Sequence, residues 1–471
     1  MIASALRAAG IPVVWADFCV SSWSREDIRG LAARARGVNL IGLTLYDSYF
    51  ERAKALLGVL RSATDAYIAV GGMMPTRSPL ETFVHLPEAD FVVRGAGEEI
   101  VPRLMVLLGG RGRSEGLAPD QLSRLGALEG LLFAGGGMRL GAAPEKILRP
   151  EDPDAAPLDF ELLEAEHVAS GIELCLSRGC GYGCLFCTST DKGLFAGVSP
   201  RRFSEILGAY GRRLEKIFGG FSRVPGAAFG IGFYDDDFLG DPARAWRILR
   251  VIRKSPFFLR FFQASVSSFF RRGARGLALE ETLLDELCPE VLEPKFGRVE
   301  KTGWHQVYLG TESFCDAELE RLGKAHRGAQ TRQLVEALSR RGVRQAHHFI
   351  ASNVRTTPRD VEDSLESIVS LSQRCGPAFG VLEPVIAHLK SFPLTPSYEG
   401  LARRGLIAQV RLRGRLALKG FPEYDYPLVD HDEPVDERVA AFARGLDGVA
   451  PVDWPEQLAR WRSRSGANAL S

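Results

Sequence analysis

The sequence is dominated by an alternation between short apolar segments and amphipathic helical segments, and this alternation occurs in two series. The first series covers residues 1–110 and the second covers residues 166–392. Strands separated by helices form parallel sheets, because each helix carries the chain back to the same edge of the sheet before the next strand begins. The pattern therefore predicts an α/β protein built on two parallel sheets.

The first series predicts a doubly wound, Rossmann-like domain at residues 1–110. Its expected strands are residues 11–18, 38–46, 67–70 and 90–93, and its expected helices are residues 2–9, 25–36, 50–64 and 98–108. Ligands of such sheets bind beyond the carboxyl ends of the strands, where glycine lets a ligand approach the backbone closely. The candidate ligand-contacting residues at these ends are Thr44, Tyr46, Gly71, Gly72 and Gly95.

The second series predicts a partial (β/α)6 barrel of the TIM type at residues 166–392. Its expected strands are residues 172–176, 229–233, 261–266, 307–310, 346–350 and 380–386. The chemistry of such barrels takes place at the carboxyl ends of the strands. Residues 111–165, where Gly135, Gly136 and Gly137 resemble a hairpin tip, are predicted to be a linker, and residues 393–471 a C-terminal helical tail.

The composition excludes several classes of protein. With 59 lysines and arginines against 58 acidic residues, the chain has no excess charge that would attract nucleic acid or an anionic membrane. Its first residues lack the basic head and apolar run of a signal peptide, and no apolar stretch reaches the ~18 residues that a membrane span needs. We therefore expect a cytoplasmic protein, in which clustered cysteines indicate metal binding or catalysis rather than disulfides.

Three cysteines form the strongest single motif. Cys180, Cys184 and Cys187 lie on a glycine-rich loop directly after an expected strand, and loops of this kind hold iron–sulfur clusters. Three thiolates leave one iron of a 4Fe-4S cluster open, so that this iron could chelate a small ligand. The alternative is a structural zinc site, but zinc takes four protein ligands. Cys175 is expected in the core, and His167 lies too far upstream to complete such a site.

The cysteine spacing, with the aromatic Phe186 before the third cysteine, resembles the radical S-adenosylmethionine superfamily. The resemblance continues at residues 233–238, 310–313 and 392–398, and it implies that a 4Fe-4S cluster cleaves S-adenosylmethionine to a 5'-deoxyadenosyl radical. It places residues 234–237 near the methionyl amino group. The cofactor-binding residues that it implies are Phe186, Tyr234, Asp235, Asp236, Asp237, Glu312 and Ser313. The competing interpretations are a solvated loop for the aspartates and a salt bridge for Glu312.

Residues 70–76 and 90–98 resemble the cobalamin-binding domain that precedes the barrel in one branch of that superfamily. This resemblance implies a base-off cobalamin whose lower face rests on Leu45, Tyr46 or Asp47. A lower histidine ligand is not indicated, because the Asp-x-His-x-x-Gly pattern is absent. Such domains usually open with a central strand, whereas this chain begins with an expected helix. The alternative is therefore a trimmed domain that only packs on the barrel.

Together these features predict a cobalamin-dependent radical methyltransferase that acts on an unactivated carbon of a specialised metabolite or a peptide. One alternative is a radical enzyme that catalyses cyclisation or rearrangement without methyl transfer. Another is a non-catalytic cobalamin or iron–sulfur sensor. The expected partners are a small-molecule or peptide substrate and an external electron donor such as flavodoxin or ferredoxin. His347 and His348 are neighbours on an expected strand, so one of them must point away from the site.

Overall fold

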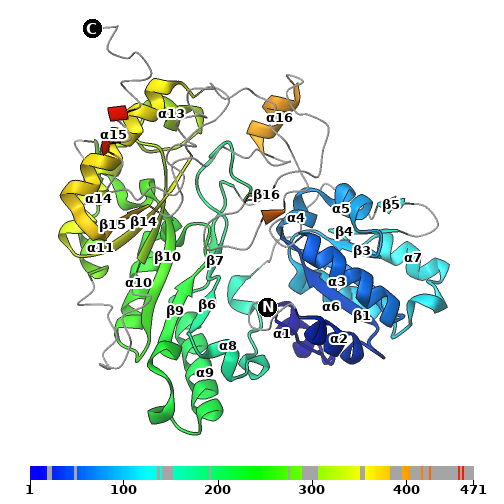
Figure 1. Cartoon of the computed structure of the whole chain (residues 1–471). Helices are drawn as coiled ribbons and strands as arrows, with labels where there is room; N and C mark the ends of the chain where they lie inside the picture. The colour runs from blue at the N-terminus through cyan, green and yellow to red at the C-terminus, as the bar shows by residue number, and fades with distance from the viewer. Residues whose placement is uncertain are drawn as a thin grey trace. The chain divides into compact units, whose positions relative to one another are not determined.

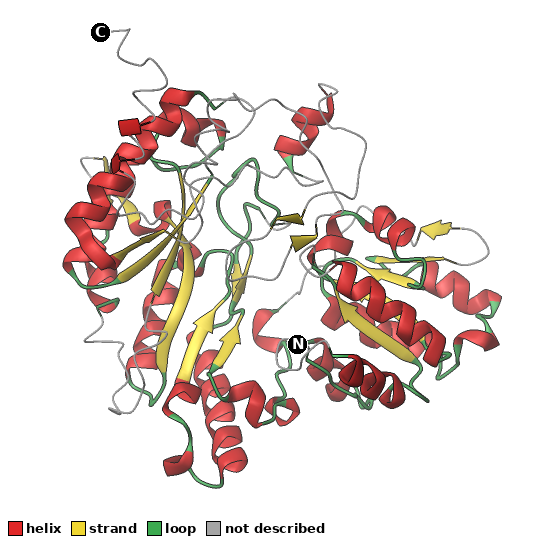
Figure 2. Ribbon diagram, in the orientation of Figure 1, coloured by secondary structure: helices red, strands yellow, loops and turns green. Residues whose placement is uncertain are grey.

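The computed structural model describes residues 1–17, 24–46, 50–134, 138–140, 152–189, 192–273, 276–288, 306–350, 356–381 and 395–403, with the pairs 415–416, 424–425, 455–456 and 459–460. The chain forms two compact units. One comprises Met1–Leu162 and Phe392–His431, and the other Leu163–Ser391 and Asp432–Ser471. Figures 1 and 2 show the elements of each unit.

A mixed sheet of five strands forms the centre of the first unit. Its strands follow the order of the chain: β1 (Leu40–Thr44), β2 (Tyr67–Gly71), β3 (Phe91–Val93), β4 (Leu131–Ala134) and β5 (Met138–Leu140). The first three strands are parallel, and β4 and β5 run antiparallel to their neighbours. The expected parallel strands are therefore present, with a hairpin added beside β3.

Helices cover both faces of this sheet, as a doubly wound fold requires. The helices are α1 (Ile2–Ala8), α2 (Arg25–Arg34), α3 (Phe50–Ala63), α4 (Met73–Arg77), α5 (Pro79–His85), α6 (Gly97–Leu108) and α7 (Pro119–Gly126). Leu57 of α3, Met74 of α4 and Phe83 of α5 belong to one buried cluster with Ile68. The side chains of α6 and α7 form a second cluster with the alternate residues of β2 and β3.

The first unit differs from the sequence prediction at two places. Residues 11–17 form no strand, because Pro12 offers no amide donor and Val14 and Trp15 are exposed rather than packed on the sheet. The predicted linker at 111–165 is wrong for its first part, since α7, β4 and β5 belong to the first unit. Strand β4 was not predicted because it is short and fully buried at Leu131–Phe133, so that its sequence pattern is weak. The three glycines 135–137 lie outside the described residues.

The second unit contains a six-stranded sheet that is parallel throughout. Its strands again follow the order of the chain: β6 (Ile172–Leu174), β9 (Gly230–Phe233), β10 (Phe258–Ser265), β13 (Gln306–Glu312), β14 (Arg344–Phe349) and β15 (Phe379–Val381). These six strands confirm the predicted (β/α)6 partial barrel. Residues 382–386, also predicted as strand, lie outside the described residues.

The remaining elements connect or flank these strands. The helices are α8 (Ala165–Val168), α9 (Pro200–Phe218), α10 (Pro242–Arg253), α11 (Glu281–Glu286), α13 (Asp316–Arg321), α14 (Gly328–Arg340), α15 (Pro358–Cys375) and α16 (Pro396–Arg403). The strand pairs are β7 (Ser177–Arg178) with β8 (Ala196–Gly197), β11 (Phe270–Gly273) with β12 (Gly276–Leu279), and β16 (Arg415–Leu416) with β17 (Tyr424–Asp425). The predicted tail thus contains a strand pair as well as a helix. No helix in the described ranges has the length and apolar character of a membrane span.

Helix α9 shows how the sequence builds the outer layer of the barrel. The Ser199 hydroxyl caps its start by accepting a hydrogen bond from the Arg202 amide, and Pro200 occupies the first turn. It ends at Gly219, which adopts the left-handed conformation with φ 69°. Its buried Phe203 packs against Phe233 of β9, with ring centroids 5.8 Å apart. This contact places α9 on the Phe233 face of the barrel sheet.

Candidate active site at the carboxyl ends of the barrel strands

The three cysteines of the motif lie on one loop that follows β7. All three are free thiols of intermediate burial. The loop is closed by a hydrogen bond from the Gly193 amide to the Cys180 carbonyl, 2.8 Å long. Further along the loop, the Cys187 amide donates to the Cys184 carbonyl at 3.3 Å. The backbone therefore holds the three thiols on a short segment at the carboxyl ends of the strands, where barrels carry their chemistry.

The aspartates after β9 fix this loop. The amides of Leu176 and Ser177 donate to Asp235 Oδ1 at 2.6 and 2.7 Å. Asp236 Oδ2 accepts from the Gly179 amide at 3.2 Å and from the Ser189 hydroxyl at 3.0 Å. These contacts give Asp235 and Asp236 a structural role in holding the loop, whatever else they bind.

Asp237 reaches the loop through two hydroxyls. Its Oδ2 accepts from Ser268 at 2.6 Å, and the Ser268 hydroxyl lies 3.1 Å from that of Tyr182, between the first two cysteines. Asp235 and Asp237 are 1% and 0% exposed, which excludes the solvated-loop interpretation for both. Burial raises the pKa of each to about 6, although their hydrogen bonds lower it. Tyr234, in contrast, is 53% exposed.

Glu312 and Lys324 form a buried ion pair beside the cysteine loop. Lys324 Nζ lies 3.4 Å from Glu312 Oε1, and the two side chains are 5% and 10% exposed. The same ammonium is 5.9 Å from the centroid of the Phe186 ring. Glu312 has φ 62°, the one positive φ among the described residues other than glycine, and such strain is concentrated at functional sites. The salt-bridge interpretation of Glu312 is therefore what the structure shows.

The ammonium of Lys324 also interacts with the thiols. Burial lowers the pKa of Lys324, but Glu312 and the thiols of Cys184 and Cys180 outweigh burial, so that its pKa is raised and it remains charged. In the sequence, Lys324 belongs to the segment after residues 310–313 that resembles the radical superfamily, but no role was assigned to it. Its position depends on the turn after α13, where Leu322 accepts a hydrogen bond of 3.0 Å from the Leu185 amide of the cysteine loop. Only this contact between distant segments shows the lysine to be part of the site.

Two other predicted positions do not join this group. The Ser313 hydroxyl lies 2.8 Å from that of Ser364 in α15 and accepts from the Cys315 amide at 3.1 Å. Its side chain therefore points to the helical layer, away from the Glu312 carboxylate, as neighbouring strand residues do. Cys175, expected in the core, is exposed, and its thiol donates to the Ser177 carbonyl.

The donor set fits an iron–sulfur cluster. Burial raises the pKa of Cys180 to about 12 and also raises that of Cys187, so the thiols need positive charge nearby to become thiolates. Lys324 supplies it, and so does Lys192, whose ammonium donates to the Cys184 carbonyl at 3.1 Å. The Ser189 amide donates to Cys187 Sγ at 3.3 Å. Within the described ranges, no three His, Cys, Asp or Glu side chains are grouped as ligands of a single metal ion.

The predicted residues of the first unit gather at the carboxyl edge of its sheet. Thr44 and Gly71 are in register at the ends of β1 and β2. Gly72 has φ 106°, and a Cβ atom there would lie 2.9 Å from the Leu45 carbonyl oxygen, so only glycine fits. Gly95 has φ 84°, and its amide donates to the Thr76 hydroxyl at 3.2 Å. The edge therefore presents bare backbone, with one buried charged side chain, Arg94, whose Nε donates to the Thr76 carbonyl at 3.2 Å.

Of the three residues expected below a corrin ring, the structure favours one. Tyr46 is 48% exposed at this edge. Leu45 is fully buried, with its amide bonded to the Gly71 carbonyl, and cannot contact a ligand. Asp47 lies outside the described residues. Tyr46 is therefore the side chain that is free to meet a flat ligand here.

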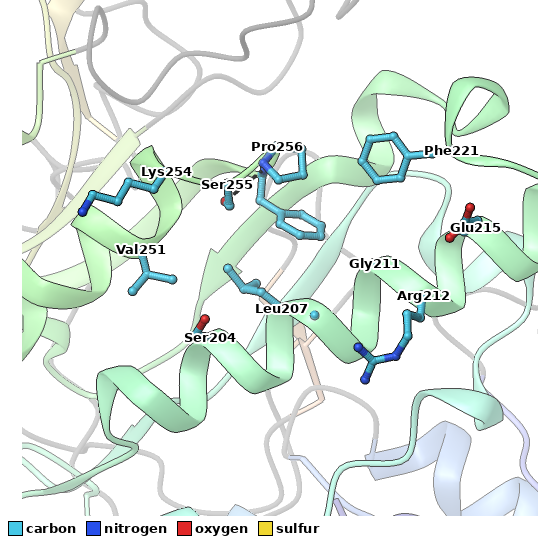
Figure 3. A pocket seen from close by; sticks show the side chains of 12 residues that line it. Ser204, Leu207, Gly211, Arg212, Glu215, Phe221, Val251, Lys254, Ser255 and Pro256 are labelled. Carbon is cyan, nitrogen blue, oxygen red and sulfur yellow. Dashed lines mark hydrogen bonds between the residues drawn. The ribbon is translucent and has the colours of Figure 1, made fainter.

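A hollow in the described part of the chain lies away from these residues. It has a volume of about 430 Å³ and lies between α9 and α10 on the outside of the barrel (Figure 3). Ser255, Pro256 and Phe257, which line it, precede β10, so the hollow is at the amino ends of the strands. None of the predicted site residues lines it, and it plays no part in the candidate site.

The comparisons with known proteins agree with this arrangement. Residues 1–105 match the family model described as the B12 binding domain. A six-stranded partial barrel with a three-cysteine loop follows it. The chain therefore combines a segment that matches the B12-binding domain with a partial barrel that carries a three-cysteine loop.

Solved structures share the fold over nearly the whole chain. The chain is similar to OxsB, a cobalamin-dependent S-adenosylmethionine radical enzyme solved with aqua-cobalamin, at a TM-score of 0.67 and 16% identity, covering 95% of this chain and 63% of that one. It is similar to the radical S-adenosylmethionine methyltransferase TsrM from Kitasatospora setae, at a TM-score of 0.64 and 16% identity, covering 98% and 95%. The chain thus shares the fold of these two solved enzymes.

A curated relative points the same way. An uncharacterised methyltransferase from Pyrococcus horikoshii is 23% identical over 349 residues, which cover 71% of this chain and 64% of the relative. The chain therefore spans less than two thirds of the length of this relative and of OxsB.

Proposed function

We propose that this chain is a cobalamin-dependent radical S-adenosylmethionine methyltransferase that acts on an unactivated carbon of a small metabolite or a peptide. The observation that carries the proposal is the loop of three free, partly buried thiols, held by aspartates and flanked by the Lys324–Glu312 pair. The names of OxsB, TsrM and the archaeal methyltransferase, and the B12-binding match, support it.

Cys180, Cys184 and Cys187 would hold the 4Fe-4S cluster. When bound, the cluster supplies the electron that cleaves S-adenosylmethionine, and cobalamin supplies the methyl group to be transferred. Asp235 and Asp236 keep the cysteine loop on the strand ends through four hydrogen bonds. Asp237 fixes the same loop through Ser268. These residues orient the loop before any cofactor binds, which reduces the entropy lost on binding.

Lys324 would neutralise part of the charge of the thiolates and offers an ammonium to a carboxylate such as that of S-adenosylmethionine. The ammonium can bind this carboxylate in addition to Glu312, because the Glu312 carboxylate, 3.4 Å away, already fixes its position. The carboxylate of Glu312 faces the same region, from a strained backbone held by the end of β13. An amino-acid moiety carries both an ammonium and a carboxylate group. This pair therefore provides the two opposite charges that such a moiety requires at one point of the site.

The corrin would rest on the carboxyl edge of the first sheet. Gly71, Gly72 and Gly95 leave the backbone bare there, and Thr44 and Tyr46 add a hydroxyl and a ring. Shape rather than charge would therefore decide cobalamin binding.

The second candidate function is a radical rearrangement without methyl transfer. It is favoured by one observation: residues 11–17 form no strand, so the described sheet has no strand beyond β1 on that side. A smaller sheet offers a shorter edge to a corrin.

The test uses the full chain, reconstituted anaerobically with iron and sulfide and then incubated with hydroxocobalamin. We expect bound iron, cleavage of S-adenosylmethionine to 5'-deoxyadenosine with dithionite, and corrin absorbance that stays with the protein after gel filtration. Cleavage without retained corrin would favour rearrangement. The absence of both iron and cleavage would overturn the proposal and favour a non-catalytic role.

The matched variants are Cys184→Ala and Cys288→Ala. Cys288 is a cysteine of intermediate burial just after α11, outside the loop. Cys184→Ala should abolish cleavage, whereas Cys288→Ala should leave it unchanged. Equal activity in the two variants would contradict the assignment of the cluster ligands.

A further inference from the structure

The face of the barrel sheet opposite to α9 carries a row of rings. Tyr234, Phe261, Tyr308 and His348 follow one another across four elements of the sheet, from the end of β9 to β14. Their successive centroids are 4.9, 5.4 and 6.2 Å apart. The first two contacts are edge-to-face, which is a favourable geometry for aromatic pairs.

The opposite face of the same sheet carries a different row, and the comparison is informative. There, Phe203, Phe233, Phe238 and Phe262 are all fully buried. Phenylalanine has no polar atom and suits a closed core. The first row instead contains two tyrosines and a histidine beside the buried Phe261, and its Tyr234 is 53% exposed. Tyrosine and histidine carry polar atoms on an apolar ring, so they suit a surface that contacts a ligand as well as other rings.

A β-bulge places part of this row. The register between β9 and β10 shifts at Leu259 and Phe261, so that Arg260 is an extra residue. A methyl group on Gly230 would lie 2.5 Å from Arg260 Cδ, and one on Gly232 would collide with the Phe261 ring. The bulge therefore turns two consecutive side chains toward the same face, over two glycines that leave room for them. Bulges with this effect are over-represented beside active sites.

Three charged groups, Arg260, Glu173 and Arg344, lie near Tyr308 of the row. Arg260 Nη1 lies 4.0 Å from Glu173 Oε1 of β6, and its guanidinium carbon is 5.9 Å from the Phe261 ring centroid. The charges of Arg260 and Glu173 therefore balance each other. A ligand can therefore contact the edges and faces of these rings without separating a pair of opposite charges.

We infer that this ring row (Tyr234, Phe261, Tyr308 and His348) is the substrate-binding surface and that it takes an aromatic or heteroaromatic ring. The inference rests on the proposed function, because it assigns the substrate class of that same barrel. A planar substrate ring extends the row by one more edge-to-face or stacked contact. A saturated ring of the same size fills the same space but lacks the ring electrons that this contact uses.

The experiment measures binding of 2-naphthol and of its saturated counterpart decahydro-2-naphthol to the anaerobically reconstituted full chain by calorimetry. We expect 2-naphthol to bind at least about fivefold more tightly. Tyr308→Leu should remove most of that difference, and Tyr308→Phe should retain it because the ring remains. Equal binding of the two compounds by the unaltered protein would overturn the inference.

Phe221→Leu is the matched control, since Phe221 is an exposed ring in the hollow between α9 and α10. It should leave naphthol binding unchanged. If Phe221→Leu abolishes binding and Tyr308→Leu does not, the ring binds in that outer hollow and the inference is wrong. Circular dichroism and iron content of each variant show whether it is folded. A preparation that binds 2-naphthol but does not cleave S-adenosylmethionine would contradict the proposed function and not this assignment.

Discussion

The two sheets of this protein end in edges of opposite chemical character. The carboxyl edge of β1–β3 is built mainly from glycines and backbone groups, with Gly72 and Gly95 in conformations that other residues rarely adopt and the buried Arg94 as its charged side chain. The carboxyl edge of the barrel is built from charged side chains, with Asp235, Asp237, Glu312 and Lys324 all buried. We therefore expect the first edge to bind its ligand mainly through shape and the second edge to bind its ligand mainly through charge. Substitutions should therefore fail in different ways at the two edges.

The largest effect is expected for Lys324→Met. This change leaves the Glu312 carboxylate buried without its partner, which costs about 3–5 kcal/mol in the free energy of unfolding. Urea unfolding of the cluster-free protein measures this cost. In the double variant Lys324→Met/Glu312→Gln most of the stability should return, because no buried charge remains. A double variant as unstable as the single one would show that Lys324 does not stabilise the fold through its ion pair with Glu312.

The next effect concerns the anchor of the cysteine loop. Asp235→Ala removes the acceptor of two backbone amides and should cost about 2–4 kcal/mol, since each buried donor left unsatisfied costs about 1–3 kcal/mol. Asp235→Asn keeps an oxygen acceptor and should cost less. Unfolding by urea and the iron content after reconstitution give the two readouts. Normal iron content in Asp235→Ala would contradict the anchoring role.

At the first edge, Gly72→Ala should cost about 1–3 kcal/mol and lower corrin retention, because alanine is strained at φ 106° and its methyl group meets the Leu45 carbonyl. The matched change is Gly58→Ala in α3, where no atom lies within 4 Å of the added carbon. Helix propensity should make that variant more stable by up to about 1 kcal/mol. Hydroxocobalamin retention and thermal unfolding distinguish the two variants. Equal effects would show that shape at Gly72 is unimportant.

Acid should affect the barrel unit before the first unit. Burial lowers the pKa of both His347 and His326 to about 3. Because these folded-state values lie below the unfolded value of about 6.5, stability is complete above pH 6.5 and is lost as the pH falls toward 3. The loss should be about 1 kcal/mol per histidine near pH 5.5. Asp235 and Asp237, whose folded pKa values of about 6 lie above the unfolded value, should return somewhat less than about 1 kcal/mol each over the same range, so that a net loss remains. Hydrogen exchange of peptides from each unit between pH 7 and 5.5 tests this order, and His347→Gln should reduce the effect.

The sequence predicted the barrel strands well because each is an apolar run between helices. It also placed the cysteine loop, since its residues are adjacent in the chain. The strand at 11–18 was wrong because apolar composition alone does not provide a neighbouring strand. The role of Lys324 was missed because it depends on contacts between segments that are distant in the chain. The bulge at Arg260 could not be predicted from the sequence either, because it arises from pairing with β9 and not from local conformational preference.

The strands of the barrel pair in the order in which the chain supplies them. During synthesis each new strand can therefore add to the free edge of those already formed, without waiting for one to insert between them. The cysteine loop is made near the start of this process, its aspartate anchors come with the next strand, and Lys324 arrives only after the fourth. Lys192 is made with the loop, so we expect the positive charge beside the thiols to be complete only once Lys324 has also been made. Iron delivery would then be timed to follow most of translation rather than to accompany it.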